Sequence, residues 1–204
     1  MKIVISSGHG KYVRGASGYL DEVDEAVRVV DEVAQILGDS GVGVKVFHDT
    51  TSKTQSENLN AIVNYHNAQE RDLDVSVHFN CNVTTQNPVG TECLYKTQQE
   101  LAAKVAEAIG YSSTLIDRGE KYRSDLKFLN ATEEPAILIE VCFVDSRADA
   151  DAYDMHFADI CKAIAKTISG KSPNPNPTPP PNPGAKVEIK TTGEVEVWVN
   201  GSRI

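Results

Sequence analysis

Long apolar runs are missing from this sequence of 204 residues. A membrane-spanning helix needs roughly 20 consecutive apolar residues, and no segment approaches that length. The first residues, MKIVISSGHGK, hold a short apolar run but no hydrophobic region as long as that of a signal peptide. We therefore expect no membrane insertion. We also expect synthesis in the cytoplasm without a signal peptide, so that any export uses another route.

A surplus of basic residues is missing as well. The chain has 20 Lys and Arg against 29 Asp and Glu, which gives a formal net charge of −9. Nucleic-acid binding depends on cations that neutralise phosphates, so this balance argues against nucleic acid as a partner. It also disfavours adhesion to anionic membranes. The hydrophobic share of 40% and the charged share of 24% are ordinary for a globular protein with a sizeable core.

Cysteines are few, and none of them forms a CxxC pair. Such pairs are typical of structural zinc sites and redox motifs. Three of the four cysteines stand in apolar or helical contexts, which favours buried thiols over a structural disulfide. The four are Cys81, Cys93, Cys142 and Cys161.

The composition changes near residue 171. Residues 171–184 are rich in Pro and Asn, which predicts an extended, semi-rigid linker. Residues 185–204 alternate like strands, with turn signals at Thr192-Gly193 and Asn200-Gly201. About 20 residues are too few to bury a core of their own. We therefore predict one globular domain over residues 1–170, followed by an incomplete module that is stable only by docking or self-association.

Short β-rich runs alternate with amphipathic stretches through the first 170 residues. This alternation predicts an α/β fold, in which one twisted, mostly parallel sheet carries helices on both faces. Residues 111–125 are expected to form a polar loop. Strands are expected near 2–6, 42–48, 73–79, 90–95, 127–129 and 136–143, and helices near 21–37, 56–69, 98–109 and 149–168.

One apolar run, AILIEVCF at residues 136–143, is interrupted by the carboxylate of Glu140. Such a run is typical of a strand buried on both faces of a parallel sheet. Burying an unpaired carboxylate costs several kcal/mol, so Glu140 is expected to be neutral, paired with a cation or placed beside a metal. The run alone does not decide between a structural ion pair and a functional site.

Two other predicted strands carry histidines at their carboxyl ends, His9 after IVISSG and His78 in LDVSVHFN. Ligands of open α/β sheets bind outside these ends, and neighbouring strands lie only about 5 Å apart. Glu22, at the start of the first helix, is expected near the same edge. Two imidazoles and a carboxylate are a common ligand set for catalytic zinc, with a second carboxylate as the general base.

The residue types leave two assignments open. Either His9, Glu22 and His78 bind the metal and Glu140 is the base, or Glu140 is a ligand and Glu22 is an acid that suits the helix dipole. A lone histidine at a strand end is more often a hydrogen-bonded polar residue than a ligand. The remaining histidines are interpreted as structural or surface residues: His48, His66 and His156.

Four motifs follow one another along residues 1–169: SGHG at 7–10, YLDEVDEA at 19–26, SVHFN at 76–80 and PAILIEVCF at 135–143. In this order they resemble the zinc-dependent N-acetylmuramoyl-L-alanine amidases of the third amidase family, found in bacterial autolysins and phage endolysins. The departures concern loop shape, because Ser6-Ser7 stand where many members have Asp-Pro, and Lys11 where many have Gly.

The resemblance implies that His9, Glu22 and His78 bind one Zn²⁺ and that Glu140 is the catalytic carboxylate. It thereby settles the choice between the two glutamates. Asn80 is expected to orient a ligand or the substrate. The cations of the 111–125 loop are expected to meet an acidic peptide: Arg118, Lys121 and Arg123.

The implied reaction is hydrolysis of the amide between N-acetylmuramic acid and L-alanine of the peptidoglycan stem peptide. Two alternatives are a zinc peptidase that cleaves another cell-wall amide and a non-catalytic wall-binding module. A wall-binding module is expected to have lost a ligand or the base. Without a signal peptide, a phage endolysin that folds in the host cytoplasm and acts on the wall after release is favoured over a secreted autolysin. Residues 185–204 would then begin a wall-binding or oligomerising module.

Overall fold

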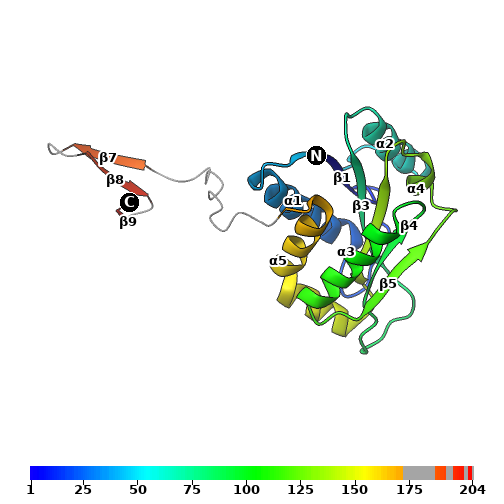
Figure 1. Ribbon diagram of the computed structural model, residues 1–204. Coiled ribbons are helices and arrows are strands. Elements are labelled where there is room, and N and C mark those ends of the chain that lie inside the picture. The colour runs from blue at the N-terminus through cyan, green and yellow to red at the C-terminus, as the bar shows by residue number, and fades with distance from the viewer. Residues whose placement is uncertain (172–186, 192–194, 200–201, 204) are drawn as a thin grey trace. The chain divides into compact units, whose positions relative to one another are not determined.

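The computed structural model describes residues 1–171 and, beyond them, the strands at 187–191, 195–199 and 202–203 (Figure 1). The chain divides into two units, Met1–Asn174 and Pro175–Ile204. Most of the predicted linker and both predicted C-terminal turns lie outside the described residues, so the domain boundaries stay predictions. No helix in the described part combines the length and apolar character that crossing a membrane requires.

A six-stranded sheet forms the centre of the first unit, in the order β2-β1-β3-β6-β4-β5. The strand β4 runs antiparallel to β6 and parallel to β5, and the other neighbours are parallel. The predicted mostly parallel sheet is therefore confirmed. The strands are β1 (Lys2–Ser7), β2 (Gly43–Phe47), β3 (Leu73–Asn80), β4 (Thr91–Tyr95), β5 (Asp117–Tyr122) and β6 (Ala136–Phe143).

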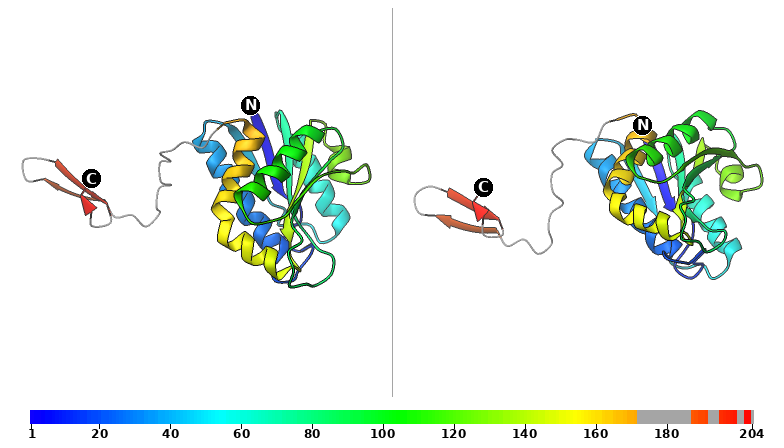
Figure 2. Two further views of the ribbon diagram at one scale, coloured as in Figure 1. Left: turned by 60° about the horizontal axis from the view of Figure 1, so that its bottom comes forward. Right: turned by 90° about the horizontal axis from the view of Figure 1, so that it is seen from below.

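Helices cover both faces of this sheet, as predicted (Figures 1 and 2). The helices α1, α3 and α5 pack together on one face, whereas α2 and α4 pack together on the other. The bounds are α1 (Glu22–Asp39), α2 (Gln55–Asn67), α3 (Gln99–Ser112), α4 (Lys127–Ala131) and α5 (Arg147–Ser169).

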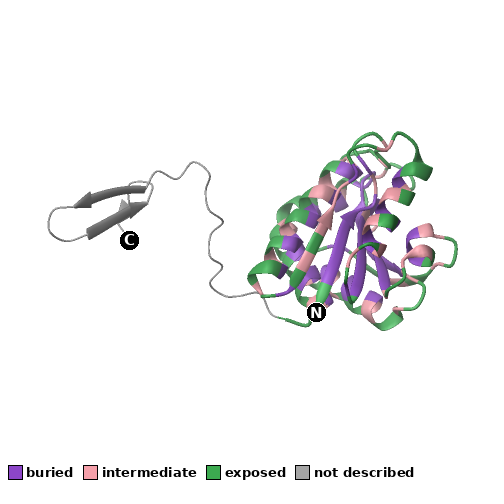
Figure 3. Ribbon diagram, turned by 90° about the horizontal axis from the view of Figure 1, so that it is seen from above, coloured by how far each residue is buried: buried purple, intermediate pink, exposed green. Residues whose placement is uncertain are grey.

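The alternation of side chains along β6 decides which layer each residue joins. Ile137 and Ile139 belong to the large hydrophobic core under α1, α3 and α5. Leu138 belongs to a smaller cluster that includes Phe128 of α4. Successive residues of a strand point to opposite faces, so Glu140 lies on the same face as Leu138. Figure 3 shows how far the central strands are buried between the helices.

Two predictions of local structure were wrong. Residues 117–122 form the strand β5 rather than part of a polar loop, and residues 127–131 form the helix α4 rather than a strand. The sequence of β5, DRGEKY, lacks apolar alternation because this strand pairs only with β4 at the sheet edge, where charged residues are common. The helix α4 is too short to show a helical period, and it buries Phe128 and Leu129.

The second unit contains the strands β7 (Val187–Thr191), β8 (Val195–Val199) and β9 (Ser202–Arg203). They form an antiparallel sheet in the order β7-β8-β9. The predicted β character of this segment is confirmed. Its self-association stays a prediction.

A buried polar network joins β1, β3 and α2. His66 lies 2.8 Å from Asp74 Oδ1 through Nδ1 and 3.0 Å from Ser6 Oγ through Nε2. Arg71 donates to both Asp74 oxygens, at 2.7 and 2.9 Å. Ser6, His66 and Asp74 have no exposed surface. The order Ser-His-Asp is that of a hydrolytic triad, but a fully buried hydroxyl cannot meet a substrate. The network is therefore structural, as expected for His66.

We expect Asp74→Ala to lower the free energy of unfolding by about 3–5 kcal/mol, because it leaves the buried Arg71 guanidinium without its carboxylate. Urea unfolding followed by circular dichroism measures the change. The matched control is Asp151→Ala, which breaks an ion pair with Arg147 whose side chains are 54% and 56% exposed. This control should cost less than about 1 kcal/mol. Equal losses in the two variants would contradict the structural role of the network.

Candidate metal and catalytic site

The start of α1 fixes the carboxylate of Glu22 below the surface. Asp21 caps the helix by accepting from the backbone N–H groups of Val23 and Asp24, so Glu22 is the first helical residue. Its Oε2 accepts from Ala16 N at 2.7 Å, and its Oε1 accepts from Phe79 N at 3.2 Å. The residue is 3% exposed. Two fixed backbone donors thus hold this acid in one orientation at the end of β3.

His9 and His78 lie against the same carboxylate. Nδ1 of His78 is 2.9 Å from Glu22 Oε1, and Nε2 of His9 is 3.5 Å from it. The two imidazole rings meet edge to face with centroids 5.1 Å apart. One nitrogen of each histidine and one oxygen of Glu22 all lie within 4.8 Å of one another. The sequence predicted these three residues as ligands, and the structure brings them together.

Two glycines make room for this arrangement. A Cβ atom at Gly8 would lie 1.8 Å from Nε2 of His78, so no other residue fits there without moving the ring. Gly15 has φ of +71°, and a Cβ at this position would lie 2.3 Å from Oε2 of Glu22. Glycine is the residue that tolerates both this backbone conformation and such close approach.

Burial and mutual charge shift the pKa values of the three residues. Burial opposes the charged form of His78, but hydrogen bonding to Glu22 and the charges of Glu140 and Glu22 outweigh it and raise the pKa of His78. Burial lowers the pKa of His9 despite the nearby Glu22 charge. Burial would raise the pKa of Glu22, but His78 and His9 hold it below the usual value. Glu22 is therefore anionic and available to a cation near neutral pH.

Glu140 lies directly beside this cluster. In the parallel pairing of β3 and β6 it is the register partner of His78. Its Oε2 is buried and has no hydrogen-bond partner among the described residues. Burial raises the pKa of Glu140 to about 7, with the Glu22 and Glu92 charges adding to the rise and His78 opposing it. A carboxyl group with this pKa can both take up and release a proton near neutral pH.

Glu92 is a residue of this region that the sequence analysis missed. It faces Glu140 in the antiparallel pairing of β4 and β6 and is 8% exposed. Asn80 Nδ2 donates to its Oε1 at 2.9 Å, and Arg118 Nε donates to its Oε2 at 2.9 Å. Asn80 and Arg118 therefore meet at Glu92. Their roles as orienting or substrate-binding residues stay predictions. The sequence around Glu92 predicts only a short strand. It does not indicate which residue of another strand lies opposite this glutamate.

A groove of about 360 Å³ opens over Glu140 and His78. Leu94 and Leu138 belong to its lining, as do Gln55, Asn58 and Leu59 of α2. The segment between β5 and α4 also lines it, with Arg123, Asp125 and Leu126, as do Lys127 and Phe128 of α4. The three candidate groups His9, His78 and Glu140 thus open into a space that accommodates an extended ligand.

The other histidines and the cysteines lie outside the cluster. His48 contacts Ser7 Oγ at 3.0 Å and Asp31 Oδ1 at 3.1 Å, and Ser7 donates to the carbonyl of His9 at 3.1 Å. His156 lies at a kink within α5. Cys81 is exposed, whereas the other three cysteines are buried, and all four are free thiols. The predicted buried thiols are confirmed.

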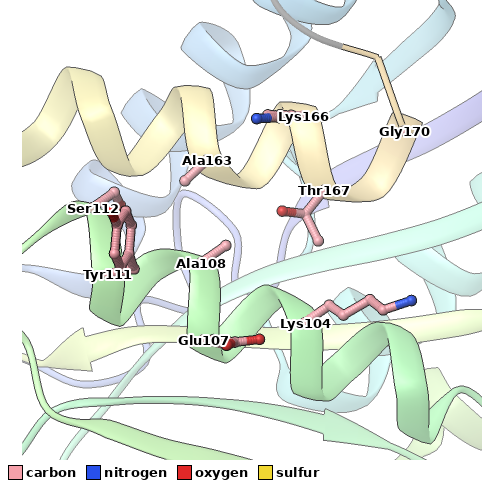
Figure 4. A pocket seen from close by; sticks show the side chains of 9 residues that line it. All are labelled: Lys104, Glu107, Ala108, Tyr111, Ser112, Ala163, Lys166, Thr167 and Gly170. Carbon is pink, nitrogen blue, oxygen red and sulfur yellow. The ribbon is translucent and has the colours of Figure 1, made fainter.

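A larger hollow of about 540 Å³ lies between α3 and α5. Figure 4 shows Lys104 and Glu107 on one helix and Lys166 and Thr167 on the other. Its lining contains no histidine and a single acid, Glu107. The hollow therefore offers no set of donors comparable to that of His9, Glu22 and His78.

Comparison with known proteins identifies relatives over this unit. Residues 3–170 match the family model Amidase_3, described as N-acetylmuramoyl-L-alanine amidase. An uncharacterized 38.4 kDa protein of Clostridium perfringens is 32% identical over 189 residues, which cover 85% of this chain and 54% of that protein. The chain spans about half the length of the first curated relatives it matches.

Solved structures with the same fold include the catalytic domain of an endolysin and an N-acetylmuramoyl-L-alanine amidase. The catalytic domain of the CD27L endolysin, which targets Clostridia Difficile, is 27% identical with a TM-score of 0.76, covering 85% of this chain and 99% of that domain. The amidase AmiC2 of Nostoc punctiforme is 25% identical with a TM-score of 0.70, covering 83% of this chain and 96% of that chain.

We expect Gly8→Ala to weaken divalent metal binding by roughly 10–100-fold, because the new methyl group displaces the His78 ring. Isothermal titration with Zn²⁺ measures the affinity, and the thermal midpoint reports whether the variant folds. The matched control is Gly38→Ala in α1, where a Cβ meets nothing within 4 Å. Gly38→Ala should leave the affinity unchanged. Wild-type affinity in folded Gly8→Ala would contradict this account of the site.

Proposed function

Because the chain belongs to the N-acetylmuramoyl-L-alanine amidase family, we propose that it hydrolyses the amide between N-acetylmuramic acid and L-alanine of peptidoglycan with one bound Zn²⁺. His9, Glu22 and His78 would hold the metal, and Glu140 is the catalytic carboxylate. The observation that carries the proposal is the convergence of three ligand-type atoms within 4.8 Å next to Glu140. Family membership supports the reaction, and this geometry supports the roles of the residues.

The donor set suits zinc on chemical grounds. Two imidazole nitrogens and one carboxylate oxygen are a frequent protein ligand set of catalytic zinc, which keeps a further position for water or substrate. Glu22 is anionic and locked by two backbone donors, so little rearrangement is needed to bind a cation. The glycines at positions 8 and 15 leave the space that the ligands occupy.

Bound zinc would supply a Lewis acid that polarises the amide carbonyl and lowers the pKa of water from about 16 toward about 7. Glu140 accepts the proton of the attacking water, because its carboxylate lies beside His78 at the base of the groove. It then delivers this proton to the nitrogen of L-alanine, which leaves as an amine. Burial raises the pKa of Glu140 and a bound cation would lower it, so the two effects oppose each other in setting the proton affinity of this group.

Glu92 supports this proton transfer from the neighbouring strand. Asn80 and Arg118 hold its carboxylate through one hydrogen bond each. A fixed negative charge opposite Glu140 favours the protonated form of Glu140 and so keeps its pKa high. We propose that Asn80 and Arg118 act on the reaction through Glu92.

The experiment that tests the reaction uses purified cell walls and the metal-loaded protein. Hydrolysis should release L-alanine amino termini without forming new reducing ends of glycan. Treatment with a chelator should abolish this release, and added Zn²⁺ should restore it. Metal analysis of the protein should give one zinc per chain. Amino termini of any other wall residue would instead identify a zinc peptidase, which is the second candidate that the site chemistry permits.

We expect Glu140→Gln to lower the rate of L-alanine release by about 10²–10⁴-fold, because the amide cannot accept the water proton. Its zinc content should equal that of the wild type, since Glu140 is not a ligand in this proposal. The control is Glu107→Gln, which removes an exposed acid of α3 that lies outside the groove. A near wild-type rate in Glu140→Gln would refute the assignment of the base.

For the biological setting we propose a phage endolysin that is made in the host cytoplasm and reaches the wall after release. The similarity to the catalytic domain of the CD27L endolysin supports this setting. Addition of the protein to clostridial cells from outside should lower the turbidity of the suspension. If the protein hydrolysed isolated walls but left whole cells intact, the result would argue for a bacterial amidase with another task.

A further inference from the structure

The groove over Glu140 has one charged wall and one uncharged wall. The segment between β5 and α4 contributes Arg123 and Asp125, and the start of α4 contributes Lys127. The facing residues of α2 are neutral: Gln55, Asn58 and Leu59. The lining thus holds two cations, Arg123 and Lys127, beside two acids, Asp125 and Glu140, the latter being the candidate catalytic carboxylate. Among the described residues that line the groove, an anionic group would therefore meet an arginine or lysine only on this side of it, at Arg123 or Lys127.

Arg123 is the best placed of these cations. Its backbone N–H donates to the carbonyl of Tyr95 at 2.8 Å, which ties the residue to β4. Its guanidinium donates from Nε and Nη2 to the two oxygens of Asp125, at 2.8 and 2.7 Å. This two-pronged contact is the geometry with which arginine binds carboxylates. The guanidinium group of Arg123 is therefore already oriented to bind a carboxylate, and the carboxylate it binds in the structure is that of Asp125.

The ion pair between Arg123 and Asp125 can be exchanged at little cost. The two side chains are 42% and 66% exposed, and such pairs contribute little to stability. The other cations nearby are engaged differently. Arg118 pairs with Glu92, Lys121 donates to the carbonyl of Arg118, and Lys127 donates to Asn60 across to α2. Arg123 is the member of this group whose present partner, Asp125, also lines the groove.

We propose that Arg123 binds the α-carboxylate of the second residue of the stem peptide and that this carboxylate replaces Asp125. The inference rests on the proposed amidase function. In the stem peptide, D-glutamate follows L-alanine, and it is present either with a free α-carboxylate or as the amide, isoglutamine. Two residues span about 7 Å, and Arg123 and Glu140 line the same groove of about 360 Å³. The enzyme therefore prefers the free acid to the amide.

The preference is measured on soluble, uncrosslinked glycan–peptide strands in two forms that differ only at this group. One form carries D-glutamate and the other D-isoglutamine, both with lysine as the third residue so that no side-chain carboxylate lies there. We expect an apparent KM about tenfold lower for the acid form, with similar kcat. Titration of both forms into zinc-loaded Glu140→Gln, which binds without turnover, gives the same ratio as an affinity.

Three variants separate recognition from a structural role. Arg123→Gln should raise the apparent KM of the acid form to that of the amide form, and Arg123→Lys should keep part of the preference. Asp125→Asn should lower the apparent KM of the acid form, because the internal competitor is gone. The matched control is Arg147→Gln, which removes an exposed arginine paired with Asp151 on α5 and should change neither form.

Equal apparent KM values for the two forms in the wild type would overturn the inference. The inference would also be overturned if Asp125→Asn and Arg123→Gln both raised the apparent KM for both forms. Such a result would mean that the ion pair between Arg123 and Asp125 stabilises the loop rather than binding substrate. Neither result affects the proposed function, which fails separately if the wild type releases no L-alanine amino termini from intact walls. The two failures are therefore distinguishable.

Discussion

The burial of the Glu22 carboxylate is the constraint on which the site depends. An anion that is 3% exposed is stable only if donors surround it. Here the donors are the backbone N–H groups of Ala16, in the loop before α1, and of Phe79 in β3, together with the His78 ring, and His9 lies 3.5 Å away. The first turn of α1, the glycine-rich loop before it and two strands are thus fixed against one another. The same negative charge makes the cluster a receptor for a cation.

The reversal of strand direction at β4 gives the site its second feature. Because β4 runs antiparallel to β6, Glu92 lies opposite Glu140. Burial raises the pKa of Glu140, and the charge of Glu92, which Asn80 and Arg118 hold in place, adds to this rise. The strand β5 then runs alongside β4, and the chain that leaves it forms the charged wall of the groove. The position of β4 and β5 beside β6 thus contributes one of the charges near Glu140 and also the segment proposed to recognise the substrate.

Much of the fold follows from local sequence patterns. The apolar runs of β1, β3 and β6 and the helical period of α1 and α5 are strong, and their predicted positions agree with the structure to within a few residues. The prediction failed at β5 and α4. An edge strand needs no apolar alternation, and a helix of five residues shows no period. In both segments, contacts with other parts of the chain decide the conformation.

The sequence by itself determined which residue types are available for chemistry: His9, Glu22, His78 and Glu140, each at the end of a predicted element or inside an apolar strand. Only the tertiary structure decided that β3 and β6 are neighbours, that Glu92 faces Glu140, and that Arg118 turns to Glu92 while Arg123 lines the groove. The physical reason is that strand order and register arise from packing between segments far apart in the chain. A side chain's partner across a sheet therefore leaves no mark in its own neighbourhood of the sequence.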